Sequence, residues 1–146
     1  QILYSAHWLI PWCSGAVGLY ALVKLVRGYI NENAFTDTHS RLVRIYSGLM
    51  DLQATTGLIY FLWRGVQVDG FPIYRFLHGL TMFVATLIPH FSARWNNADD
   101  STRYITNFYL LLSSFLLTLL GLSFIPELTK QPLTMTNSDT SSEKLD

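Results

Sequence analysis

The chain has 146 residues, of which 50% are hydrophobic and only 14% are charged, and its ten basic residues balance ten acidic ones. The neutral balance excludes nucleic acid as a partner, because nucleic-acid binding requires a basic face. The single cysteine, Cys13, excludes an internal disulfide. So few charges, combined with long apolar stretches, indicate an integral membrane protein and not a soluble domain.

Four apolar segments follow one another along the chain, each near the length of about 20 residues that a helix needs to cross a bilayer. In chain order they cover residues 3–26, 42–63, 73–93 and 104–125. The connections between them are short and polar, so neighbouring helices must run in opposite directions. The sequence therefore predicts an all-α, integral membrane, up-down-up-down four-helix bundle over residues 1–127, followed by a disordered polar tail over residues 128–146.

The connections also carry signals for helix ends and for orientation. Asp69-Gly-Phe-Pro72 is a predicted turn, and Asp100 or Ser101 is the expected N-cap of the fourth helix. One end of the predicted bundle holds six basic residues, against four at the end that holds both termini. By the positive-inside rule the end with six faces the cytoplasm. The six are Lys24, Arg27, Arg41, Arg44, Arg94 and Arg103.

Two histidines occupy matched positions in the first and third segments. His7 lies about four residues into the first segment, and His78 lies about five residues into the third. Because these two helices run in the same direction, both side chains fall at a similar depth. Histidines on facing helices of a bundle can ligate a haem iron from both sides. The pair predicts one b-type haem with His7 and His78 as its metal ligands.

The other two histidines suggest a weaker second pair, His39 with His90. His90 follows His78 by twelve residues, which on a regular helix leaves the two side chains about 120° apart. Two haems stacked along one helix need ligands on nearly the same face, so the spacing is unfavourable. His7 and His90 could instead lie at headgroup level, and His78 could instead donate to a backbone carbonyl, to Asp51 or to Gln53.

Asp51 is the most costly residue of the predicted membrane region, because it lies near the middle of the second segment. An ionised carboxylate in hydrocarbon is heavily penalised, so we expect it to point into the bundle. Its expected partner is Gln or His from a neighbouring helix, or an arginine that reaches inward. A structural pairing and a role in proton relay or quinone contact both stay open.

Several short motifs occur together over residues 6–121. They are His7-Trp8, Asp37 with Arg41, Asp51-Leu-Gln53 with Gly57, and Arg75-x-x-His78-x-x-x-Met82-x-x-Ala85 leading to His90. This combination resembles a family of small bacterial four-helix membrane proteins that are labelled cytochrome b-like. The resemblance implies that the cofactor-binding positions are His7, Asp51, Gln53, Arg75, His78 and His90.

The function favoured by these features is a b-type cytochrome-like electron carrier in a bacterial inner membrane, crossing it several times. The alternative is a non-catalytic accessory subunit of a larger respiratory or photosynthetic membrane complex, in contact with lipid, quinone or (bacterio)chlorophyll. A proton or small-solute carrier centred on Asp51 is weaker, because internal repeats are lacking. No nucleophile set, phosphate loop or CxxCH motif is present, which argues against a stand-alone enzyme.

Overall fold

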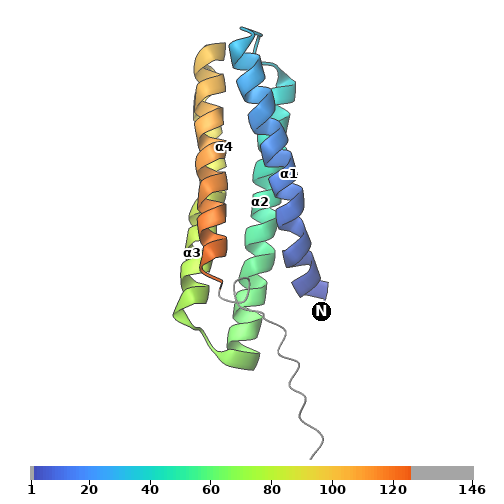
Figure 1. Cartoon of the computed structure of the whole chain (residues 1–146), viewed down its shortest axis with the longest axis vertical. Coiled ribbons are helices and arrows are strands. Elements are labelled where there is room, and N and C mark those ends of the chain that lie inside the picture. Colours follow the sequence, from blue (N-terminus) through green and yellow to red (C-terminus); the bar gives the residue numbers. More distant parts are fainter. Residues whose placement is uncertain (1, 126–146) are drawn as a thin grey trace, which may run out of the picture.

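The computed structural model describes residues 2–125, of which 88% are helical, with no strand among them. Four long helices lie side by side along the long axis of the molecule (Figure 1). They are α1 (Ile2–Ile30), α2 (Asp37–Arg64), α3 (Ile73–Leu87) and α4 (Asp100–Ser123). A π-helical turn, η1 (Gly65–Asp69), follows α2, and a 3₁₀ helix, η2 (Ile88–Trp95), continues α3. The predicted all-α fold with four helices is confirmed.

Each helix packs against two others, so that α1 and α3, like α2 and α4, face each other diagonally. The adjacent pairs are α1 with α2, α2 with α3, α3 with α4, and α4 with α1. Along α1, His7 lies against Gly57 of α2, and Gly18 lies against Tyr46. Helices α1 and α2 therefore run in opposite directions.

Within the described residues 2–125, three helical segments are long and apolar enough to cross a membrane: Ser5–Ile30, Ile73–Trp95 and Asp100–Ser123. These lengths and compositions indicate a membrane protein whose helices could contact lipid. Helix α2 is not among them, although its 28 residues exceed the length that a crossing requires. Asp51, Gln53 and two threonines at its middle lower its hydropathy.

One helix end differs from expectation. Helix α4 begins one residue earlier than predicted, and its N-cap is Asp99, whose carboxylate accepts a hydrogen bond from the Thr102 backbone N–H at 2.9 Å. The Thr102 hydroxyl donates a second hydrogen bond to this carboxylate at 2.7 Å, and the two bonds hold the pKa of Asp99 below its ordinary value. The predicted turn before α3 is present, with Gly70 at a φ of 72° and Pro72 as the N-cap. The predicted tail, residues 128–146, lies outside the described residues.

A buried hydrogen-bond chain joins the helices at mid-height. The Tyr46 hydroxyl lies 3.0 Å from Ser114 Oγ, and Ser114 donates to the carbonyl of Ala85 at 2.7 Å. Because the single hydroxyl proton of Ser114 is donated to that carbonyl, the Tyr46 hydroxyl is the donor to Ser114 Oγ. Gly18 admits the Tyr46 ring, because a Cβ at this position would lie 2.7 Å from ring atom Cε2.

Pro89 explains both the change of helix type and the role of Ser114. Proline has no N–H, so an α-helix passing through Pro89 leaves the carbonyl four residues earlier, that of Ala85, without its partner. The chain passes from α3 into η2 at Ile88, with buried Pro89 in the first turn. The Ser114 hydroxyl satisfies the Ala85 carbonyl from α4. The buried hydrogen-bond chain therefore satisfies the one α3 carbonyl that Pro89 leaves without a backbone partner.

Candidate functional site

His7 lies near the start of α1 with its imidazole packed against α2. The ring stacks on Tyr60 with centroids 6.0 Å apart. Gly57 provides the space, because a Cβ there would lie 2.8 Å from His7 Cε1. Nδ1 is buried and has no hydrogen-bond partner within residues 2–125, so the fold leaves one imidazole nitrogen unused.

His78 lies in the second turn of α3 and reaches the last turn of α4. Its Nδ1 lies 2.8 Å from the Gly121 carbonyl oxygen, and because a carbonyl can only accept, Nδ1 is the donor. The same carbonyl accepts a hydrogen bond from the Phe124 backbone N–H at 3.3 Å, so His78 adds a second donor at the end of α4. The absence of a side chain at Gly121 allows α3 to approach α4 closely, because a Cβ there would lie 3.0 Å from Met82 Sδ. A neutral His78 therefore has its free lone pair on Nε2.

The structure brings His7, Gln53 and His78 to one end of the bundle, which we call the His7 end. His7 lies against Gly57 of α2, one turn beyond Gln53, and His78 hydrogen-bonds to Gly121 near the end of α4. Gln53 is only 4% exposed, and its Oε1 is a second buried atom without a partner in the described part of the chain. Arg75 begins α3 and donates to the Gly70 carbonyl at 3.3 Å. The role of these residues in holding a cofactor stays a prediction.

The prediction that Asp51 points into the bundle is wrong. Successive helical residues differ by 100°, so Asp51 and Gln53 lie about 200° apart on α2. Because Gln53 is buried, Asp51 faces outward, and its side chain is 49% exposed. The predicted kind of partner, a histidine from a neighbouring helix, is confirmed: His90 Nε2 lies 2.9 Å from Asp51 Oδ1. The His90 side chain is also about half exposed, at 48%, so the pair lies on the outer surface.

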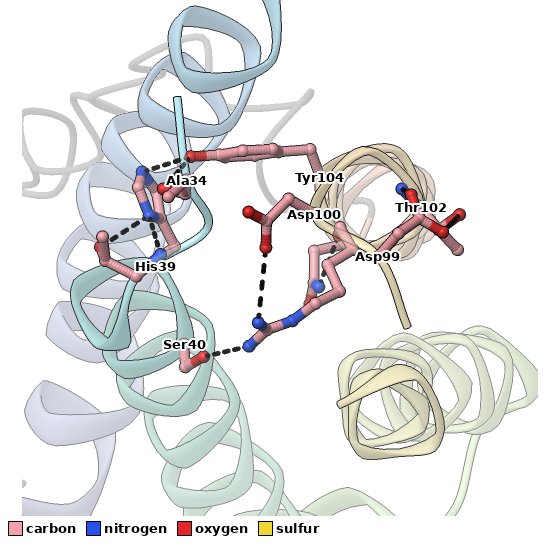
Figure 2. Close-up of polar contacts among 10 residues, drawn as sticks. Ala34, His39, Ser40, Asp99, Asp100, Thr102 and Tyr104 are labelled. Carbon is pink, nitrogen blue, oxygen red and sulfur yellow. Dashed lines mark hydrogen bonds and ion pairs between the residues drawn. The ribbon is translucent and has the colours of Figure 1, made fainter. Parts of the chain in front are cut away.

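His39 belongs to a separate cluster at the opposite end, which we call the His39 end (Figure 2). Its Nδ1 accepts from the Thr36 backbone N–H at 3.2 Å and lies 3.0 Å from the Thr36 hydroxyl, which together cap α2. Nδ1 is therefore the unprotonated nitrogen, and Nε2–H is directed at the Tyr104 hydroxyl oxygen, 3.4 Å away. Tyr104 in turn donates to the Ala34 carbonyl at 3.1 Å. Both ring nitrogens of His39 thus face structural partners, and the weaker second haem pair of His39 with His90 stays a prediction.

Charge also acts on His39. Partial burial lowers the pKa of this imidazole from its ordinary value, and the positive charges of Lys24 and Arg103 lower it further. The Arg103 guanidinium lies 4.1 Å above the Phe35 ring and 3.8 Å from the Asp100 carboxylate. The neutral ring that the cap requires is thus the form that its surroundings favour.

Sequence reasoning missed the polar side chains that hold the core, Tyr46, Ser114 and Tyr104. Ser114 is a small residue inside an apolar run, and no motif singles out the two tyrosines. Their partners are far apart in sequence, so the pairs are not visible along the chain. One usable signal was Pro89, because a proline inside a helix requires a donor from elsewhere.

Among residues 2–125, no group of three or more histidine, cysteine, aspartate or glutamate side chains is placed to hold a metal ion. A haem iron held by two histidines does not require such a group. No family model, curated protein or solved structure matches the chain.

Proposed function

We propose that this protein is an integral membrane protein of four antiparallel spanning helices, resident in a bacterial inner membrane. In this proposal it holds one b-type haem between α1 and α3, with His7 and His78 as iron ligands. Haem, when bound, supplies reversible one-electron oxidation and reduction. The protein would then carry electrons within the membrane.

The hydrogen bond from His78 Nδ1 to the Gly121 carbonyl is the observation that carries the proposal. Histidines that ligate metals commonly donate their second ring N–H to a carbonyl or carboxylate, which fixes the ring and the tautomer. His78 has this arrangement before any cofactor is considered. It presents Nε2 as the nitrogen able to ligate.

His7 supports the proposal from the other side of the bundle. Its buried Nδ1 and the buried Oε1 of Gln53 both lack partners among the described residues. Buried polar atoms in native proteins nearly always have a partner, so such atoms point to a group that is missing from the chain itself. Gly57, where a Cβ would strike the ring, reserves the space for this imidazole. These two unpartnered atoms support His7 as the second ligand in this proposal.

The test is the reduced-minus-oxidised absorbance of protein purified in mild detergent from a haem-replete host. His7→Ala and His78→Ala should each abolish the haem b absorbance. His39→Ala and His90→Ala are matched controls that remove one imidazole elsewhere and should retain it. Circular dichroism confirms that each variant is still helical. Wild-type protein without haem, or undiminished absorbance in both ligand variants, would contradict the proposal.

The outward-facing pair of Asp51 and His90 favours a second candidate, the accessory subunit of a larger membrane complex. Polar side chains that face lipid in mid-membrane are costly, so a protein partner over this pair would stabilise it. A photo-crosslinking residue at Thr55, on the same side of α2, should then label one discrete protein in native membranes. The same residue at exposed Leu116 on α4 is the control. Labelling of lipid alone at both positions would reject this candidate.

A further inference from the structure

An open cavity lies at the His39 end, where α1 finishes and α2 begins. Its volume is about 390 Å³. Six residues line it: Lys24, Arg27, Gly28, Asn31, Asn33 and His39. None of the residues of the Tyr46–Ser114 hydrogen-bond chain or of the proposed haem site lines this cavity, so its role is independent of the haem.

The lining is basic and contains no acidic residue. Lys24 and Arg27 form no ion pair within the described part of the chain, and Lys24 Nζ lies 5.8 Å from the centroid of the Tyr20 ring. The nearby Arg103 adds positive charge, although Asp100 partly balances it at 3.8 Å. The cavity therefore presents two cationic side chains that have no ion-pair partner among residues 2–125.

The remaining lining residues can supply hydrogen bonds to an anion. Asn31 and Asn33 carry exposed side-chain amides, each with two N–H donors. Ammonium, guanidinium and amide donors together match the several acceptor oxygens of a phosphate group. A carboxylate would use fewer of them.

The cavity opens where the apolar surface of α1 ends. Val26, Tyr29 and Ile30 are exposed on the last turns of that helix, beside Lys24 and Arg27. The cavity thus lies at the boundary between an apolar helix surface and a polar connection. Basic pockets at such boundaries suit the headgroups of anionic lipids.

We propose that this cavity binds a phosphate group, presented by an anionic phospholipid headgroup at the membrane surface or as free inorganic phosphate. Lys24 and Arg27 supply the charge, and Asn31 and Asn33 supply neutral donors. His39 lines the cavity and reports on binding: burial and the positive charges of Lys24 and Arg103 lower its pKa, and an added anion would oppose the contribution of those charges.

The experiment follows the His39 ring by NMR in the full chain, held in phosphatidylcholine nanodiscs. One arm adds phosphatidylglycerol, and the other adds inorganic phosphate. Either ligand should raise the pKa of His39 in a saturable manner. A response to phosphatidylglycerol that inorganic phosphate does not reproduce identifies the lipid headgroup as the source. The reverse result identifies free phosphate.

Two double variants separate a built site from general surface charge. Lys24→Gln with Arg27→Gln should weaken binding by roughly tenfold or more, since each basic residue near an anionic surface contributes substantially. Arg41→Gln with Arg94→Gln removes two exposed charges from the same end without altering the cavity lining, and should change affinity less than about twofold. Equal losses in the two variants, or no response of wild-type His39 to either ligand, would overturn the proposal.

Discussion

The two ends of the bundle differ in whether their polar groups have hydrogen-bond partners. At the His39 end, the imidazole, the Tyr104 hydroxyl and the Ala34 carbonyl satisfy one another (Figure 2). At the His7 end, His7 Nδ1 and Gln53 Oε1 are buried without partners in the described residues. Polar groups at the first end therefore satisfy one another, whereas these two atoms at the second end have no hydrogen-bond partner among residues 2–125. The predictions below test this contrast, from the largest expected effect to the smallest.

The closed network should be sensitive to volume. Gly28→Ala would place a Cβ 2.5 Å from the Tyr104 hydroxyl and ring, so Tyr104 must move and lose its partners at Ala34 and His39. We expect the free energy of unfolding in detergent to fall by about 1–3 kcal/mol. Gly48→Ala is the control, since nothing lies within 4 Å of a Cβ there. Equal stability of the two variants would show that Tyr104 is not fixed as described.

Removing a polar side chain should have different consequences at the two ends. His39→Leu deletes the cap on α2 and should lower the free energy of unfolding by about 1 kcal/mol. Gln53→Met removes an unpartnered oxygen at similar volume, so stability should be unchanged or slightly higher. Thermal unfolding by circular dichroism measures both. If Gln53→Met destabilises the protein as much as His39→Leu does, then Gln53 Oε1 has a hydrogen-bond partner within the chain.

Stability should also depend on pH through His39. The ring faces Lys24 from α1 and Arg103 and Tyr104 from α4, and its pKa in the folded state lies below the ordinary value near 6.5. The unfolded chain therefore binds more protons as the pH falls below that value, so stability is full above it and declines beneath it. Melting temperatures of the wild type and His39→Gln between pH 8 and pH 5 provide the comparison. The variant should show the smaller decline, and parallel curves would exclude His39 as the cause.

The smallest effect is expected at the outer pair. Because Asp51 and His90 are both about half exposed, their interaction in detergent should be worth less than about 1 kcal/mol. Asp51→Asn and Asp51→Leu should then have nearly equal free energies of unfolding. An inward-facing carboxylate would instead make the leucine variant several kcal/mol less stable, because its partner would be left buried without a hydrogen bond. A large difference between the variants would restore the inward orientation.

The sequence predicted the helices well and the directions of their side chains poorly. Apolar runs bounded by Gly, Pro and Asp locate all four helices to within a few residues, because the length of a run and its flanking polar residues are local properties. Asp51 was misplaced because its high cost in lipid argued for burial. The helical phase relative to Gln53 decides its direction, and no local feature reveals which of the two faces the core.

Composition and periodicity by themselves determined that this is an all-helical chain with helices apolar enough for a membrane, since both follow from hydrophobic runs along the backbone. Only the tertiary structure decided which polar groups meet. Ser114 finds the Ala85 carbonyl that Pro89 leaves open, and His78 finds the Gly121 carbonyl. His39 caps its own helix and reaches Tyr104. Contacts of this kind depend on the relative rotation and height of packed helices, which residues distant in sequence set together.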